Sequence, residues 1–225
     1  MNQIIDNFFN IAVLQETYPL LLAGLFTTVK LSLIVIPIGL LSGLSLALLG
    51  NSIKLRLFQA LLIVYVDFFR AFPPLVLLIF VYYALPMLGI EISSLGAVVI
   101  AFMLNTSAYY SEILRAGLES ISRGQYEASR STGLSAFQTL VLVIVPQAVR
   151  NVLPDLVSNT LEVLKLTALA SVVAFPELLH EARSAQGYTY NPSPLIAAAL
   201  IYLALLWPMV RLLSRFEHRM GNSIS

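Results

Sequence analysis

The stretch that decides the fold of this chain runs from Arg123 to Pro146. It reads Arg-Gly-Gln-Tyr-Glu-Ala-Ser-Arg-Ser-Thr-Gly over 123–133, then nine residues, then Val-Ile-Val-Pro over 143–146. Its apolar side chains suffice only for short amphipathic helices, with a break at Gly133 and an end at Pro146, because glycine weakens a helix and proline interrupts one. None of these pieces is long enough to cross a bilayer. The sequence therefore predicts a folded cytoplasmic region at about 115–150, with an ordinary loop between spans as the alternative.

The composition is that of a helical membrane protein. Of the 225 residues, 58% are hydrophobic and 11% are charged, against roughly 25% charged in a soluble domain, and the mean hydropathy is +0.85. We therefore predict an all-α integral membrane protein. The net charge of +1 comes with no basic patch, which argues against nucleic acid as a partner. The absence of cysteine excludes disulfides, thiolate metal sites and a cysteine nucleophile.

Five apolar stretches are candidates for transmembrane helices, which need about 20 residues each. They cover about 20–49, 58–88, 95–114, 152–175 and 195–213, in a chain that we interpret as a single domain over 1–225. The second stretch is interrupted by Asp67, Arg70 and the pair Pro73-Pro74, so we expect an amphipathic segment up to Arg70 and the span itself from Pro73 to Leu88. Residues 1–17 are expected to form a short interfacial segment, and residues 177–194 a loop.

The distribution of basic residues predicts the orientation of these spans, since cytoplasmic loops are enriched in lysine and arginine. With the N-terminus outside and the C-terminus inside, the outer segments hold only Arg183. The inner segments then collect the following basic residues: Lys54, Arg56, Arg115, Arg123, Arg130, Arg150, Arg211, Arg215 and Arg219. The same orientation places the 115–150 region in the cytoplasm.

The fourth apolar stretch is unusually polar along one side. Asp155, Ser158, Asn159 and Glu162 follow one another at i, i+3, i+4 and i+7, which puts them on one face of a helix. Ionisable groups inside a bilayer cost roughly 2.5–3.5 kcal/mol each on insertion scales, so they should face a partner or a water-filled cavity. We favour a substrate path along this face, in which the carboxylates accept an ammonium or guanidinium group. The alternative is that Glu162 only pairs with Lys165 and holds helices together.

A second polar stripe lies in the third stretch, where Asn105, Tyr109 and Glu112 are spaced at i, i+4 and i+7. It is either a further part of the substrate path or a set of hydrogen bonds between helices. Arg70 either gates the path or anchors its helix among lipid headgroups. The two histidines, His180 and His218, are isolated and lack the spacing of a metal site.

The 123–146 stretch resembles the EAA loop of the permease subunits of ABC importers. The resemblance rests on Glu127-Ala128-Ser129, on Gly133, and on the closing Val143-x-Val145-Pro146. The flanking residues resemble the branch that imports polar amino acids and opines, the histidine, glutamine and arginine type. The resemblance implies the type I ABC importer transmembrane fold with a cytoplasmic coupling helix. It implies that the following residues contact the ATPase: Gly124, Gln125, Tyr126, Glu127, Ala128, Ser129 and Gly133.

Three other segments are similar to the same family. They are Phe68-Phe69-Arg70-Ala71-Phe72-Pro73, then Asn105-x-x-Ala108-Tyr109-x-x-Glu112-Ile113-x-Arg115, and Lys165-Leu166-Thr167-Ala168-Leu169. The first and last depart from the family pattern, with Phe72, Leu166 and Ala168 where relatives carry Thr, Asp and Ser. The similarity implies gating or structural roles for Arg70, Pro73, Lys165 and Thr167, and the departures leave the substrate open.

The family implies several partners. These are two ATPase subunits that bind ATP and Mg, a second permease subunit that is a copy or a paralogue, and a periplasmic or lipid-anchored substrate-binding protein. This chain lacks a G-x-x-x-x-G-K-[ST] loop and any catalytic triad, so we expect neither a cofactor of its own nor enzymatic activity. Two other hypotheses remain. One is an ion-coupled carrier or channel that uses Glu162 and Lys165, and the other is a membrane scaffold without transport.

Overall fold

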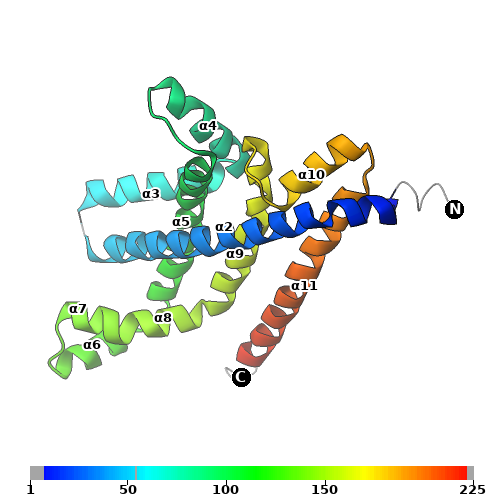
Figure 1. Cartoon of the computed structure of the whole chain (residues 1–225). Helices are drawn as coiled ribbons and strands as arrows, with labels where there is room; N and C mark the ends of the chain where they lie inside the picture. Colours follow the sequence, from blue (N-terminus) through cyan, green and yellow to red (C-terminus); the bar gives the residue numbers. More distant parts are fainter. Residues whose placement is uncertain (1–7, 54, 222–225) are drawn as a thin grey trace. The chain divides into compact units, whose positions relative to one another are not determined.

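The computed structural model describes residues 8–53 and 55–221, with side chains up to residue 215, and every regular element in this part is helical. The all-α prediction is therefore confirmed. Lys54 and the side chains of His218 and Arg219 lie outside the described part. The elements along the chain (Figure 1) are α2 Ile11–Ser52, α3 Arg56–Ala71, α4 Pro74–Met87, α5 Ser94–Glu119, α6 Arg123–Ser131, α7 Ala136–Gln138, the π-helix η1 Thr139–Ile144, α8 Val145–Asn151, α9 Leu153–Leu166, the 3-10 helix η2 Thr167–Val173, α10 Leu178–Thr189 and α11 Ser193–Gly221.

Four helical stretches of the described residues are long and apolar enough to cross a membrane: Ile11–Ser52, Ser94–Glu119, Leu153–Val173 and Ser193–Arg215. A fifth is counted if α3 and α4 are one broken span. The sequence assigned the second span to Pro73–Leu88, but α4 has only 14 residues. At 1.5 Å per residue that is about 21 Å, too short for a ~30 Å hydrocarbon core. A second span at this place would therefore need both helices, which are bent by 102° at the break between them.

Two other boundaries differ from the expectation. α2 begins at Ile11, so residues 11–17 belong to a continuous 42-residue helix and not to a separate interfacial segment. Residues 178–189, expected within a loop, form α10. Helix α10 was missed because it has few apolar residues. Its buried residues, Leu178, Ala182 and Ala185, form one narrow stripe.

The chain divides into two compact units, which we describe separately. One comprises Met1–Ile36, Pro73–Phe102 and Leu161–Ser225, and the other Pro37–Phe72 and Met103–Thr160. In the second unit α2 packs closely against α5, since a Cβ at Gly43 would lie 2.6 Å from the Cβ of Tyr110. Tyr110 is fully buried there, and its hydroxyl is 2.8 Å from Oγ1 of Thr160. The α2–α5 contact therefore forms the core of this unit.

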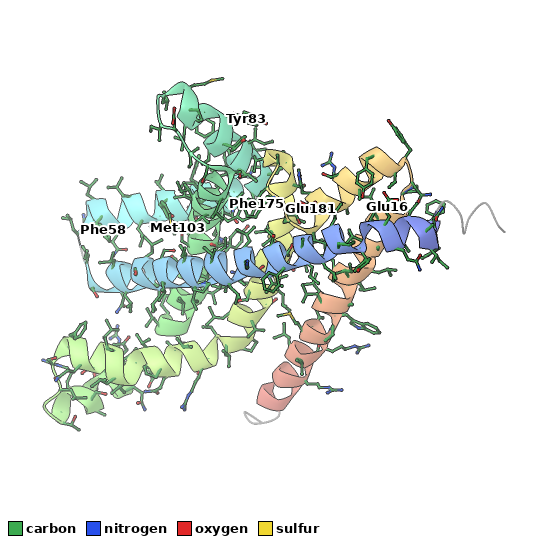
Figure 2. The ribbon with its side chains drawn as sticks, viewed as in Figure 1. Glu16, Phe58, Tyr83, Met103, Phe175 and Glu181 are labelled. Atoms are coloured by element: carbon green, nitrogen blue, oxygen red, sulfur yellow. The ribbon has the colours of Figure 1, made fainter. Side chains whose placement is uncertain are left out.

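In the first unit the core joins α2, α10 and α11 around Leu21, Leu178, Ala182 and Ala198. A fully buried carboxyl group in the same unit, that of Glu177, caps α10. The carboxylate accepts hydrogen bonds from the backbone N–H groups of Leu179 (2.9 Å) and His180 (2.7 Å) and from the hydroxyl of Tyr202 (2.7 Å). These bonds satisfy a buried charge and fix α10 against α11. Figure 2 labels Glu181, whose Cγ lies 3.0 Å from the position of a Cβ on Gly24 of α2.

Candidate functional site

The EAA-like motif lies on α6, and most of its side chains are exposed. Arg123, Gly124, Gln125, Glu127 and Ala128 are exposed, Tyr126 is partly buried, and Ser129 is buried. A nine-residue helix with this pattern has one narrow face on its own unit and the rest available to another protein. The partial burial also raises the pKa of the Tyr126 phenol above its ordinary value.

Gly133 turns the chain directly after α6. Its φ is +88°, in the left-handed region that a residue with a Cβ adopts only at a cost, and a Cβ there would meet nothing within 4 Å. Nη1 of Arg130 donates to the carbonyl of Leu134 across this turn at 2.6 Å. A capping box between Ser135 and Gln138 then starts the next helix. The predicted break at Gly133 is thus confirmed as a defined turn.

The predicted helix end at Pro146 is wrong, because the helix continues through it. Thr139–Ile144 forms a π-helix and Val145–Asn151 an α-helix directly after it. The N–H of Val145 donates to the carbonyl of Leu140, five residues earlier. The wider π turn ends where Pro146 occupies the first turn of α8, a position in which its missing N–H and fixed φ are tolerated.

The 123–151 segment is fastened to the rest of its unit at two places. Nδ2 of Asn151 donates to Oγ of Ser120 at 2.8 Å. Gly117 of α5 contacts α8 so closely that a Cβ would lie 2.8 Å from the carbonyl oxygen of Ala148. Within the segment, Nε2 of Gln147 donates to Oε1 of Gln125 at 3.3 Å. The exposed face of α6 is therefore presented by a braced scaffold.

The polar face of α9 is exposed in this single chain. Asp155, Ser158, Glu162 and Lys165 are all exposed, and Asn159 is partly buried with an Nδ2 that has no hydrogen-bond partner in the described part of the chain. Nζ of Lys165 lies 2.6 Å from Oε1 of Glu162. The intrahelical pair that was the alternative to a substrate path therefore forms. The path itself stays a prediction, since a face can carry the pair and line a path.

The predicted stripe on α5 contacts the end of α3, inside the second unit. Nδ2 of Asn105 donates to the carbonyl of Phe69 at 2.9 Å, and the hydroxyl of Tyr109 donates to the carbonyl of Arg70 at 3.2 Å. Glu112 lies 3.9 Å from the Arg70 guanidinium. These bonds are between helices, and a substrate contact for Asn105 and Tyr109 stays a prediction. The predicted structural residue Thr167 is fully buried, with its hydroxyl 2.7 Å from the carbonyl of Leu164.

Sequence reasoning missed a charged cluster around Arg115. Its guanidinium lies 2.6 Å from Glu112 and 2.6 Å from Glu119, the pairs expected at i, i+3 and i, i+4 on one helix. The cluster lines a cavity of about 570 Å³ among α2, α3 and α5 of the second unit. Among the described residues no group of three or more His, Asp or Glu could hold a metal ion.

The family is decided by the comparison of the sequence with known families. The model of the binding-protein-dependent transport system inner membrane component matches residues 35–222. The chain belongs to this family. The permease is thus a multi-pass inner-membrane subunit of an importer, and the family works with an ATPase and a substrate-binding protein. Because the family is a non-catalytic membrane component with no cofactor of its own, the prediction that the chain is not an enzyme is confirmed.

Curated relatives of the permease cover most of its length. It is 38% identical over 210 residues to a protein of Bacillus subtilis named probable glutamine ABC transporter permease protein GlnP, covering 91% of this chain and 95% of that protein. It is 36% identical over 201 residues to the probable amino-acid ABC transporter permease protein YckA of the same organism, covering 89% and 88%. It is also 36% identical over 190 residues to its arginine transport system permease protein ArtQ, covering 84% and 86%.

Solved structures agree with the permease in fold. The crystal structure of an amino acid ABC transporter with histidines matches with a TM-score of 0.81 and 36% identity, over 92% of this chain and 96% of that one. An inward-facing MetNI methionine ABC transporter matches with a TM-score of 0.72 at 18% identity, covering 88% and 94%, which supports the fold alone. The predicted type I ABC importer fold and the family resemblance are confirmed.

Proposed function

We propose that the permease imports polar amino acids or related compounds. The proposal is supported by the names of its relatives, which include glutamine and arginine transport proteins. Within this class we favour substrates with an ammonium or guanidinium group. Asp155 has no hydrogen-bond or ion-pair partner in the described part of the chain, so its carboxylate is available, whereas Glu162 is already paired with Lys165.

The exposed face of α6 is the observation that supports ATP coupling most strongly. In the proposed assembly this face inserts into a groove of the ATPase. The contact uses Gly124, Gln125, Tyr126, Glu127, Ala128 and Gly133 of the predicted set, whereas the buried Ser129 holds α6 against its own unit. Small side chains at Gly124 and Ala128 permit close approach. Closure of the ATPase pair on ATP would then move α6 and turn the spans. A ligand shifts such an equilibrium only by its different affinity for the two states.

The polar face of α9 supports a substrate path. Its exposed carboxylates and lysine would be costly against lipid, so this face should lie against water or a second permease subunit. We further propose an assembly of two permease subunits, alike or paralogous, with two ATPase subunits that bind ATP and Mg, and a periplasmic or lipid-anchored binding protein. The N-terminus would lie outside and the C-terminus inside, with 1–225 acting as one transmembrane domain whose five spans surround the path.

Charge reversal on α6 tests the coupling role. In vesicles containing the ATPase, the binding protein and the permease, Glu127→Lys should leave the permease in the membrane, preserve ATP hydrolysis and reduce uptake per ATP. Gly133→Asp should act similarly, because aspartate tolerates the left-handed region and adds a charge without removing the turn. The matched control is Glu91→Lys, which reverses an exposed charge in the turn between α4 and α5. Unchanged coupling in both α6 variants would refute the role.

The substrate is tested by competition for uptake between cationic and acidic amino acids. Glu162→Gln leaves the positive charge of Lys165 unpaired on the face that carries Asp155, so it should weaken uptake of cationic substrates more than of acidic ones. A loss confined to acidic substrates would contradict the proposed preference. Uptake by vesicles that contain this chain without any ATPase would instead support an ion-coupled carrier or channel.

A further inference from the structure

The end of α3 leaves two carbonyl groups without a backbone donor from their own helix. The last helical bond runs from the N–H of Phe72 to the carbonyl of Phe68, at 2.9 Å. In a continuing helix the next two donors would be the N–H groups of residues 73 and 74, which would reach the carbonyls of residues 69 and 70. Both residues are proline, which has no N–H. The carbonyls of Phe69 and Arg70 therefore need donors from elsewhere.

Helix α5 supplies one donor to each of these two carbonyls. Asn105, whose side chain is 1% exposed, donates from Nδ2 to Phe69 at 2.9 Å, and the Tyr109 hydroxyl donates to Arg70 at 3.2 Å. The two donors are four residues apart, so they lie on the same face of α5 and meet consecutive carbonyls at the end of α3. In a membrane an unsatisfied carbonyl is especially costly, because lipid offers no replacement donor.

The Arg70 side chain adds to this contact. Its guanidinium carbon lies 5.6 Å from the centre of the Tyr109 ring, and its Nη1 lies 3.9 Å from Oε1 of Glu112. Tyr109 therefore contacts Arg70 in two ways. Its hydroxyl donates to the Arg70 carbonyl, and its ring faces the Arg70 guanidinium. Three residues of one α5 stripe, Asn105, Tyr109 and Glu112, all contact the last turn of α3.

We propose that Asn105 and Tyr109 are positioning residues, which replace the donors missing at Pro73 and Pro74 and hold the end of α3 against α5 during transport. This role accounts for the spacing of the prolines, the asparagine and the tyrosine together. Its consequence for transport rests on the proposed function, whereas the contact between α3 and α5 can be tested without it.

Removal of single donors tests the contact itself. The chain has no cysteine, so Ala71→Cys, at an exposed position at the end of α3, accepts one spin label. In the assembled transporter, Tyr109→Phe and Asn105→Leu should increase the mobility of this label. The matched control is Tyr65→Phe, which also removes a hydroxyl that joins α3 to α5, but away from the two carbonyls. This hydroxyl lies 2.7 Å from Oγ of Ser107 and 3.5 Å from the carbonyl of Leu104. Equal mobility in Tyr109→Phe, Asn105→Leu and the parent would overturn the proposal.

Transport measurements separate positioning from direct substrate contact. Loss of one hydrogen bond to a positioned carbonyl should lower the maximal uptake rate about threefold to tenfold, with substrate affinity and the competition order unchanged. A changed competition order without a change in label mobility would assign the two residues to substrate binding and overturn the proposal. If the parent transports no amino acid, the label still tests the contact, and only the proposed function fails.

Rescue by protonation gives a further check. Asn105→Asp has nearly the same shape, but an ionised carboxylate cannot donate a hydrogen bond, whereas a protonated one can. Burial favours the protonated form. Label mobility in Asn105→Asp should therefore approach that of the parent as the pH falls from about 8 to about 5.5, and Asn105→Leu should show no such recovery. A pH response shared by both variants would count against a donor role.

Discussion

The 123–151 segment and the surroundings of Glu177 differ in how well their structure could be predicted from the sequence. In the first, a motif is visible in the sequence, yet most of its side chains on α6 are exposed. In the second, the sequence suggested only a loop, yet Glu177 is fully buried and bound by three donors. The exposed first region suits the contact outside the chain that we propose, and the second region holds the chain itself together.

The hydrogen bonds explain this difference. On α6 most of them are local, such as Ser129 to the carbonyl of Gln125, four residues earlier, and the bond from Gln147 to Gln125 spans 22 residues. Near Glu177 they join distant parts of the sequence, such as the N–H of Leu178 and the hydroxyl of Thr28, 150 residues apart. Hydrogen bonds between neighbouring residues produce a recognisable pattern in the sequence. For a hydrogen bond between distant residues, the sequence does not show which residue is the partner. The contrast predicts large stability effects at Glu177 and small ones on α6.

The largest effect is expected from Glu177→Ala. It leaves two backbone N–H groups and the Tyr202 hydroxyl without an acceptor in a buried site. At about 1–3 kcal/mol for each of the three unsatisfied groups, the free energy of unfolding should fall by roughly 3–9 kcal/mol. Unfolding in detergent micelles or nanodiscs measures it. Glu127→Ala is the matched change on the exposed face and should shift stability by less than about 0.5 kcal/mol. Similar losses at both positions would remove the contrast.

A smaller loss is expected from Gly24→Ala in the same buried region. The new Cβ would lie 2.8 Å from Cα of Leu178, a backbone atom that cannot move alone. The overpacking should cost about 1–3 kcal/mol. Gly187→Ala is the control, because Gly187 is also helical but has nothing within 4 Å, so the change should stabilise by about 0.5–1 kcal/mol. Equal effects of the two substitutions would show that α2 and α10 are not packed this closely.

Gly133→Ala should cost about 1–2 kcal/mol for a different reason. A Cβ at Gly133 meets no atom within 4 Å, but φ is +88°, so only the backbone conformation opposes it. Gly133→Asn should recover part of that loss, because asparagine tolerates the left-handed region better. Thermal unfolding of the two variants compares them directly. No difference between alanine and asparagine would contradict this account.

The sequence carried the fold class and the family, because long apolar runs and a spaced motif are local patterns. Three features could not be read from it in advance. The π turn before Pro146 depends on the register of backbone bonds. Helix α10 shows only a narrow buried stripe. The role of Glu177 depends on Tyr202, 25 residues away. Part of the contact made by Asn105 and Tyr109 could have been predicted, because Pro73 and Pro74 indicate that two carbonyls at the end of α3 lack helical donors. The sequence does not indicate which helix supplies the replacement donors.

The smallest effect concerns the pH dependence of stability in the Glu177 region. Burial raises the pKa of Glu177 above its ordinary value of 4.5, although hydrogen bonds from Leu179, Tyr202 and His180 and the charge of His180 act in the opposite direction. A carboxyl whose folded pKa is raised binds its proton more tightly in the folded state. Its contribution to stability is complete below pH 4.5 and is lost as the pH rises through the folded pKa. The unfolding free energy should therefore decrease with rising pH above 4.5, and Glu177→Gln should remove that part of the slope. A stability that instead rises with pH up to about 4.5 in the parent, but not in Glu177→Gln, would mean that the three donors outweigh burial and that the buried carboxylate is held ionised.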